Sequence, residues 1–368
     1  MKKILLVLLL ISQLIYANDT IEISILTCSA GQEVYSVFGH SAIRVIDKES
    51  NNDQVYNFGM FNFKTKNFEY KYLRGKLKYY IDIQETQDFI RDYTYEKRLI
   101  TEQVLNLNTT EKINILSNLQ FLHKPENRFY YYSFLEKNCS TQLRDLLSNI
   151  GVKFQNHELK TSNRALINLC LNKTPWLKLG INLILGKSLD KNSTSSQSMF
   201  LPEFLKEEIK ASTLNGKKMI KFEQNLNSTE SIKVFKIQWL FSPLLMFSIF
   251  ALLFLFWFPT SIRIILSTSV GLVGTFILIL WLFSGHEEVK SNLNIIWCNP
   301  LYFLYIPLII KGKTNKVLSL TLIGTLFISL LIWIFKVQTF DISIIPILAI
   351  LGFLNFNEVK KCKIPDLD

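Results

Sequence analysis

The sequence has few histidines and cysteines, the side chains that most often bind zinc and other transition metals. Its 368 residues include 4 histidines and 5 cysteines. No two histidines stand at helical spacing, and no two cysteines form a closely spaced pair. Such spacings are the usual sequence signals of a metal site. The sequence therefore predicts no metal and no other cofactor.

Long apolar runs are absent between the first 17 residues and Ile237. The first 17 residues have a basic start at Lys2 and Lys3, an apolar stretch and a small residue, Ala17, as in a secretory signal peptide. An uncleaved anchor is the alternative. No cysteine follows directly, so the chain is not itself expected to be a lipoprotein. In either case the residues that follow are expected outside the cytoplasm.

Residues 237–368 predict a transmembrane bundle. Five apolar runs have about the length that crosses a hydrocarbon core of about 30 Å; they are 237–258, 262–283, 293–310, 317–335 and 342–356. With the preceding domain outside, the basic residues on the inner side are Arg263, Lys311, Lys313, Lys316, Lys360, Lys361 and Lys363, against Lys290 and Lys336 outside. This bias follows the positive-inside rule. We therefore expect a bacterial inner-membrane protein with a periplasmic N-terminal domain and a cytoplasmic C-terminus.

The net charge of +11 is spread along the chain without a basic stripe. Nucleic-acid-binding domains usually concentrate their basic residues on one face, and export separates this domain from nucleic acid. We expect the surplus charge to attract anionic lipid headgroups instead.

The exported part predicts an α+β domain over 18–160, followed by a helical connector over 161–236. Alternating apolar residues predict strands at 21–27, 41–47 and 54–58, a hairpin turn at 48–53, and further strand within 61–83. Helices are predicted at 87–95, 110–123 and 140–149, the second capped by Thr109 or Thr110. Strands followed by helices are typical of the α+β class.

Cys139 and His40 are the residues most suited to catalysis. Cys139 stands directly before a predicted helix, where the helix dipole favours the thiolate, and His40 opens a predicted strand after Gly39. A cysteine nucleophile, a histidine base and N–H groups at a helix start would perform acyl transfer. The exported part of the chain also has three cysteines, Cys28, Cys139 and Cys170, so at least one thiol there stays unpaired within the chain.

A structural role for both residues is the alternative, because single cysteines are often small buried residues. Cys28 is a rival nucleophile, but it follows a predicted strand and lacks a helix start.

The spacing of several motifs resembles the Lnb family, which is named for lipoprotein N-acyltransferases. The matching segments are LTCSAG at 26–31, VYSVFGHSAIRV at 34–45, VYNFG at 55–59, RGKL at 74–77, ENRFY at 126–130, NCST at 138–141 with Arg144 and Asp145, and MFLP at 199–202. The resemblance covers most of 21–205 and extends more loosely to His286 and to 299–301.

This resemblance implies a circularly permuted papain-like fold, as in NlpC-type proteins and lecithin:retinol acyltransferase, in which histidine precedes cysteine. It implies a membrane-bound acyltransferase that moves an acyl chain from a glycerophospholipid, through a Cys139 thioester, to the N-terminal amine of a diacylglyceryl-cysteine lipoprotein. Asn57 is the expected partner that orients His40. Residues expected to contact substrate are Asn138, Arg144, Tyr35, His286 and Glu287, with a structural ion pair as the alternative for Arg144.

Two other functions fit the same residues. One is a cysteine peptidase or amidase that acts on peptidoglycan peptides, and the other is a non-catalytic membrane scaffold that binds lipoproteins. The predicted membrane bundle weakly disfavours the peptidase. Replacing Cys139 would separate an enzyme from a scaffold.

Overall fold

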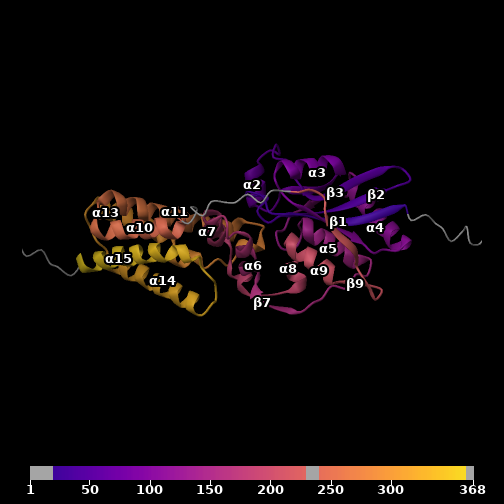
Figure 1. Ribbon diagram of the computed structural model, residues 1–368. Coiled ribbons are helices and arrows are strands. Elements are labelled where there is room, and N and C mark those ends of the chain that lie inside the picture. The colour runs from indigo at the N-terminus through magenta and orange to yellow at the C-terminus, as the bar shows by residue number, and fades with distance from the viewer. Residues whose placement is uncertain (1–19, 229–239, 362–368) are drawn as a thin grey trace, which may run out of the picture. The chain divides into compact units, whose positions relative to one another are not determined.

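The computed structural model describes residues 20–228 and 240–361 and divides into two compact units, whose elements are labelled in Figure 1. The first unit comprises Met1–Thr65, Lys78–His157 and Thr194–Glu230, and the second comprises Lys66–Leu77, Glu158–Ser193 and Ser231–Asp368. The predicted signal peptide, 1–17, lies outside the described residues. The domain boundaries expected at 160 and 236 stay predictions.

The first unit is built on an antiparallel sheet of seven strands. Their order across the sheet is β11 (Ile220–Asn225), β5 (Ile100–Leu105), β1 (Ile21–Cys28), β2 (His40–Asp47), β3 (Asn52–Met60), β4 (Lys78–Glu85) and β6 (Phe129–Tyr131). The three strands at the start of the chain and the hairpin between β2 and β3 agree with the sequence prediction. The two strands at the sheet edges, β11 and β6, were not predicted from the sequence, and nor was β5.

Helices cover both faces of this sheet (Figure 1). Ile23 and Ile25 of β1 join the larger core, which also takes in residues of α4 (Thr109–His123), α5 (Cys139–Asn149) and α9 (Pro202–Ala211). Leu26 and Cys28 point to the opposite face and pack with α3 (Thr86–Tyr95). The period-two alternation of a strand produces this division. The prediction of the α+β class for this part of the chain is confirmed.

Two local predictions were wrong. Residues 61–76 are not strand, because the segment holds the short helix α2 (Phe68–Leu73) and only β4 continues as strand. Asn67 and Gly75 bound this helix with left-handed φ angles of 57° and 62°. The cap of α4 is Asn108 rather than a threonine, since its side chain accepts from Glu111 N while the Glu111 carboxylate accepts from Asn108 N.

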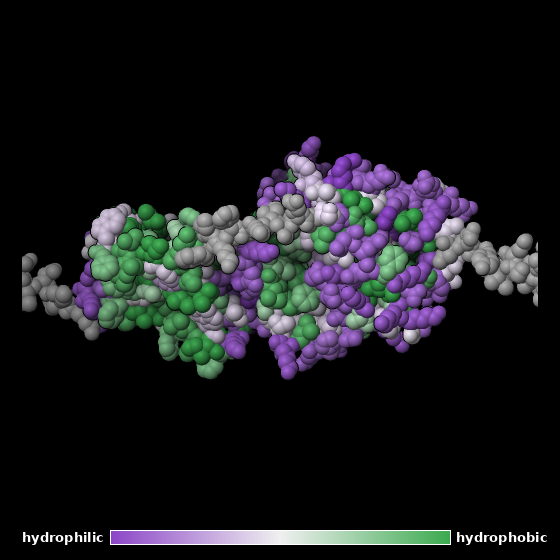
Figure 2. All heavy atoms as spheres, viewed as in Figure 1, coloured by the Kyte–Doolittle hydropathy of each residue, from purple (hydrophilic) through white to green (hydrophobic). Residues whose placement is uncertain are grey.

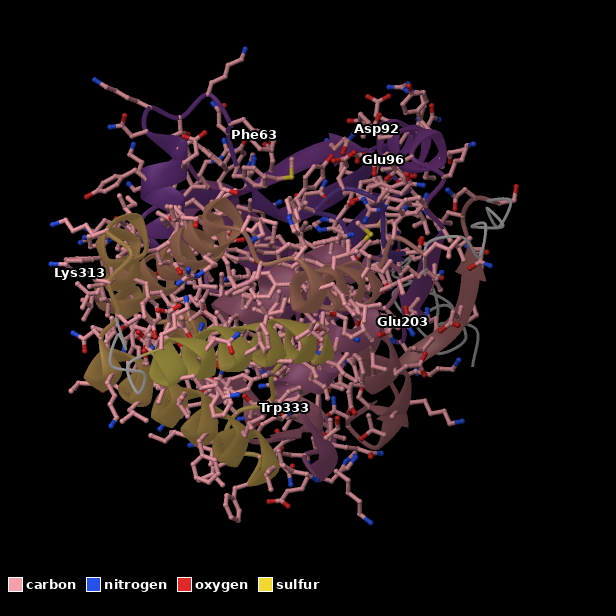
Figure 3. All side chains as sticks on the ribbon, turned by 90° about the vertical axis from the view of Figure 1, so that its left-hand side faces the viewer. Phe63, Asp92, Glu96, Glu203, Lys313 and Trp333 are labelled. Carbon is pink, nitrogen blue, oxygen red and sulfur yellow. The ribbon has the colours of Figure 1, made fainter. Side chains whose placement is uncertain are left out.

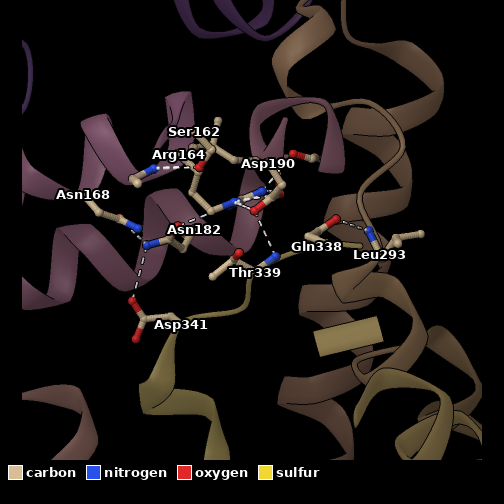
Figure 4. Close-up of polar contacts among 12 residues, drawn as sticks. Ser162, Arg164, Asn168, Asn182, Asp190, Leu293, Gln338, Thr339 and Asp341 are labelled. Atoms are coloured by element: carbon tan, nitrogen blue, oxygen red, sulfur yellow. Dashed lines mark hydrogen bonds and ion pairs between the residues drawn. The ribbon is translucent and has the colours of Figure 1, made fainter. Parts of the chain in front are cut away.

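Short elements make up the connector. They are β7 (Glu158–Ser162), α6 (Asn163–Cys170), α7 (Pro175–Ile184), η1 (Lys187–Asp190), β8 (Asn192–Thr194), α8 (Ser195–Ser198), β9 (Thr213–Leu214) and β10 (Lys217–Lys218). Within the second unit, buried Arg164 of α6 lies in a network of polar side chains, drawn in Figure 4. This network ties α6 and α7 to Thr339 and Asp341.

Among the described residues of the second unit, three helices are long and apolar enough to cross a membrane. They are α11 (Thr260–Phe283), α14 (Lys316–Ile334) and the helix Ile342–Lys361, which contains α15 (Ile345–Lys361). The other two predicted spans are shorter as helices. α10 covers Pro243–Phe256, and 294–310 is divided into α12 (Asn294–Trp297), η4 (Pro300–Leu304) and α13 (Tyr305–Ile310). Pro300 begins η4, and Pro307 lies in the first turn of α13. The structure therefore supports three of the five predicted spans.

The surfaces of the two units differ in character. In Figure 2 the helices of the second unit carry mainly hydrophobic residues on the face in view, whereas the sheet unit is mainly hydrophilic. Lys313, in the turn between α13 and α14, lies at the edge of the helices in Figure 3. Apolar helices with basic turns are typical of a membrane-embedded bundle.

Candidate active site

Cys139 is the first residue of α5, and its position is fixed by Asn138. The Asn138 side-chain oxygen accepts from the backbone nitrogens of Ser140 and Thr141, both at 2.9 Å. Its amide nitrogen donates to the carbonyls of Phe134 and Phe200, both at 2.8 Å. All hydrogen-bonding positions of this buried amide are thus occupied. Asn138 holds the start of the helix and has none left for a substrate.

His40 is the first residue of β2, and Gly39 allows the close turn before it. Gly39 has a φ of +84°, and a Cβ there would lie 2.7 Å from the carbonyl oxygen of Cys28. Any other residue would push β1 away from the turn. Steric constraints on the backbone before His40 therefore require glycine at position 39.

Asn57 lies next to His40. The side-chain oxygen of Asn57, on β3, is 3.2 Å from Nε2 of His40, and Asn57 is buried. An amide oxygen in this position accepts a hydrogen bond from the Nε2–H group, which leaves Nδ1 as the basic nitrogen. The structure thus brings together Cys139, His40 and Asn57, the three residues that the sequence singled out for catalysis.

A buried pair of hydroxyls ties the two catalytic elements together. Ser41 follows His40 on β2, Ser140 follows Cys139 on α5, and their oxygens are 3.0 Å apart. Both side chains are fully buried. This contact holds β2 and α5 at a fixed separation, and the sequence reasoning missed it, although a serine follows each catalytic residue.

The surroundings of Cys139 favour the thiolate. Burial alone would raise the pKa of this thiol, but the charge and hydrogen bond of His40, the backbone N–H of Ser41 and the hydroxyl of Ser140 lower the pKa to about 7. Cys139 as a residue is partly exposed, in contrast to the fully buried Ser140 beside it. These are the properties of a nucleophilic cysteine.

Cys28 has the opposite properties. It is 1% exposed, and burial raises the pKa of its thiol far above the ordinary value. Its sulfur is near the hydroxyl of Tyr93, whose ring stacks on His40 with centroids 6.4 Å apart. Arg98 lies over the ring of this tyrosine, 4.5 Å from the ring centroid. Cys28 therefore belongs to the packing behind His40.

Tyr130, on β6, is a further residue that the sequence reasoning missed. Its hydroxyl oxygen is buried and approaches the Gly59 backbone, but it makes no well-formed hydrogen bond within the described residues. Burial and the charge of Cys139 raise the pKa of Tyr130, so the hydroxyl stays protonated. A buried donor without a partner costs free energy and calls for a reason. A ligand oxygen bound next to Cys139 would satisfy this hydroxyl.

A backbone donor is available at the same place. The side chain of Asn138 accepts hydrogen bonds from the N–H groups of Ser140 and Thr141. The N–H of Cys139, in contrast, makes no hydrogen bond within residues 20–228 and 240–361. The first N–H groups of a helix have no partners inside the helix. The N–H of Cys139 and the hydroxyl of Tyr130 are thus two free donors near one sulfur atom.

The remaining predicted site residues occupy different places. Tyr35 is 62% exposed on the loop before His40. Arg144 pairs with Asp145 at 2.8 Å and also reaches the carbonyl of Ser196. In the second unit, His286 donates to the carbonyl of Tyr72 and Glu287 pairs with Lys290. Their roles toward a substrate stay predictions.

Comparison with protein families gives two matches. The model described as the Lnb N-terminal periplasmic domain matches residues 12–171, and the model described as the Lnb transmembrane domain matches residues 235–361. Together they cover most of the chain. No curated protein and no solved structure matches the sequence.

Proposed function

Because the chain belongs to the Lnb family, a family of membrane proteins of lipoprotein processing with a periplasmic and a transmembrane domain, we propose that it is a lipoprotein N-acyltransferase. The acyl donor is a glycerophospholipid and the acceptor is the N-terminal amine of a diacylglyceryl-cysteine lipoprotein. The observation that carries the proposal is the thiol of partly exposed Cys139 at the start of α5, with its lowered pKa and His40 beside it.

The first half-reaction forms a thioester. The Cys139 thiolate attacks the ester carbonyl of the donor, and the developing oxyanion accepts from the N–H of Cys139 and the hydroxyl of Tyr130. The C–O bond then breaks, and the leaving alkoxide takes a proton from the His40 imidazolium. A lysophospholipid leaves, and the acyl group stays on sulfur.

The second half-reaction forms the amide. The lipoprotein amine attacks the thioester while neutral His40 accepts a proton from it. The C–S bond breaks and the thiolate leaves. Water must be excluded at this stage, because hydrolysis of the thioester would turn the enzyme into a phospholipase. Asn57 acts by keeping the His40 ring oriented.

The proposed orientation places the C-terminus in the cytoplasm. Residues 66–77 lie within the match to the periplasmic domain and contact Ser284 and His286, which follow α11. On the same side, Gln338 accepts from the N–H of Leu293 (Figure 4). At the other end of these helices Arg263 pairs with Glu358. Basic residues gather at that end, as expected for the cytoplasmic side.

The permuted papain-like fold is part of this proposal. It is supported by the chain order of His40 before Cys139 and by a helix that starts at the cysteine and packs on the sheet carrying the histidine. These features are shared with the fold that the sequence resembles.

Mass spectrometry of lipoprotein N-termini tests the function. In cells that depend on this enzyme, the Cys139→Ser variant should leave a free N-terminal amine, with acyl transfer reduced at least about a thousandfold. Cys28→Ser is the matched control and should transfer as wild type. N-acylated lipoproteins in the Cys139→Ser strain would contradict the proposal, and altered peptidoglycan peptides with unchanged lipoproteins would favour a hydrolase.

A further inference from the structure

The segment Lys66–Leu77, here called the basic segment, links β3 to β4 along the chain but belongs to the unit of the membrane helices. Its helix, α2, ends at Leu73, whose carbonyl accepts from the Ser284 hydroxyl at 2.8 Å. The carbonyl of Tyr72 accepts from His286 Nε2, also at 2.8 Å. The side chains of Ser284 and His286, which follow the long apolar helix α11, therefore hold the C-terminal end of α2 in place.

Two glycines make this contact possible. A Cβ on Gly75 would lie 3.1 Å from the Gly285 backbone, and a Cβ on Gly285 would lie 2.5 Å from the carbonyl oxygen of Arg74. Gly75 also has a left-handed φ of +62°. Two backbones pack against each other here, and a side chain at either position would separate them. The basic segment is thus fixed against the end of α11.

The charge of the basic segment is strongly one-sided. It contains one acidic residue, Glu69, and four basic residues: Lys66, Lys71, Arg74 and Lys76. Within the described parts of the chain, no ion pair engages any of these four side chains. Tyr70 is 61% exposed and Leu73 is 39% exposed. Cationic, tyrosine and leucine side chains thus share one short surface segment.

The end of a membrane-spanning helix lies at the level of the lipid headgroups. Tyrosine is enriched at this level because its ring is apolar and its hydroxyl is polar. Lysine and arginine near a membrane surface are attracted to anionic headgroups, and each adds up to about fivefold to the affinity. A segment with both kinds of residue, fixed at the end of α11, matches this environment.

We propose that the basic segment binds the phosphate-bearing headgroups of anionic phospholipids in the periplasmic leaflet. Lys66, Lys71, Arg74 and Lys76 supply the charge, and Tyr70 and Leu73 enter the interface between headgroups and acyl chains. The site goes beyond the proposed acyl transfer, since it does not require Cys139 or His40. It recognises the lipid surface rather than the reacting ester.

Native mass spectrometry of the detergent-purified full-length protein tests this binding. The probes are phosphatidylglycerol and phosphatidylcholine with identical acyl chains. Wild type should prefer phosphatidylglycerol, and the preference should fall as salt rises. In the variant K66Q/K71Q/R74Q/K76Q we expect the affinity for phosphatidylglycerol to fall at least about tenfold, with phosphatidylcholine binding unchanged.

The matched control removes four other exposed lysines, in the variant K153Q/K191Q/K217Q/K218Q. It should bind phosphatidylglycerol as wild type. Equal loss in both variants, or no loss in the first, would overturn the proposal.

A second measurement does not depend on how the variants fold. Wild-type protein in nanodiscs with phosphatidylglycerol that carries a photoreactive headgroup should crosslink within 66–77, and no crosslink there would also overturn the proposal. Cys139→Ser should bind the lipid as wild type. The failure of lipid binding and the failure of acyl transfer are therefore distinguishable.

Discussion

Two of the buried polar clusters among the described residues, one around Cys139 and one around Arg164, differ in how many of their donors are paired. Every nitrogen of the Arg164 guanidinium has a partner (Figure 4). Nε contacts both Asp190 oxygens at 3.0 Å, Nη1 donates to Asn182 at 3.2 Å, and Nη2 donates to the carbonyls of Leu185 and Gly186. Around Cys139, the Tyr130 hydroxyl and the Cys139 N–H donate no well-formed hydrogen bond to any part of the chain that the structure describes.

This difference separates a structural cluster from a site for chemistry. A fully paired network fixes the relative positions of its segments and leaves nothing to bind a ligand. Unpaired donors beside a reactive sulfur lower the stability of the resting protein and become useful only when a substrate oxygen arrives. The two clusters should therefore respond in opposite ways to the loss of a polar group.

The largest effect on stability is expected at Arg164. Arg164→Met removes the charge and leaves buried Asp190 without its ion-pair partner, which should lower the free energy of unfolding by about 3–5 kcal/mol. Denaturant titration of the detergent-solubilised protein measures it. Arg144→Met is the matched control, since its partner Asp145 is exposed, and it should cost below about 1 kcal/mol. Equal losses in the two variants would contradict the structural role.

Tyr130→Phe should give the opposite pattern. The ring and its packing stay, and only the unpaired hydroxyl is lost, so stability should be unchanged or slightly higher. The rate of thioester formation should fall about a hundredfold, which is typical for one oxyanion donor. Single-turnover acylation of Cys139 with a phospholipid donor measures the rate. Tyr131→Phe, an exposed neighbour on the same strand, should change neither quantity; a similar slowing there would rule out a specific donor at Tyr130.

The sequence was informative about the catalytic elements because their signals are local. Asn138 and Thr141 form a capping box. Neighbouring residues in the sequence therefore indicate where the helix begins, and Cys139 stands at that point. The alternation in β1 to β3 is equally local, and the pair Asn108 and Glu111 carried the same cap signal for α4. Tyr130, Tyr93 and the contact between Ser41 and Ser140 depend on strand order and on which helix covers which face, and no short pattern encodes these.

The segment 61–77 was misread for a related reason. Its closely spaced aromatic residues resemble those of a strand, but left-handed residues at Asn67 and Gly75 bound a short helix inside it. The turn at Gly75 packs against Gly285, more than 200 residues later in the chain. In the membrane half, hydropathy found α11 and α14 well because lipid-facing helices are uniformly apolar. It could not show that the run 294–310 is divided into shorter helices around Pro300 and Pro307.

A pH titration extends the comparison to the two thiols nearest His40. With a pKa of about 7, Cys139 is about half thiolate at pH 7, whereas a thiol with an ordinary pKa would be only a few per cent ionised. Because only the thiolate reacts, alkylation of Cys139 should rise about tenfold per pH unit below pH 7 and level off above it. Cys28, buried and with a raised pKa, should stay unmodified throughout. Peptide-resolved mass spectrometry after brief iodoacetamide treatment separates the two.

The variant His40→Asn tests whether His40 sets the pH at which alkylation of Cys139 levels off. Without the imidazole, only the Ser41 N–H and the Ser140 hydroxyl stabilise the thiolate against burial of the sulfur. The pKa of Cys139 should therefore rise, and alkylation at pH 7 should slow by at least about tenfold. Tyr35→Phe, on the exposed loop before His40, serves as the control and should keep the wild-type profile. An unshifted inflection in His40→Asn would mean that the start of α5 alone activates the thiol, and the base would have to be sought elsewhere.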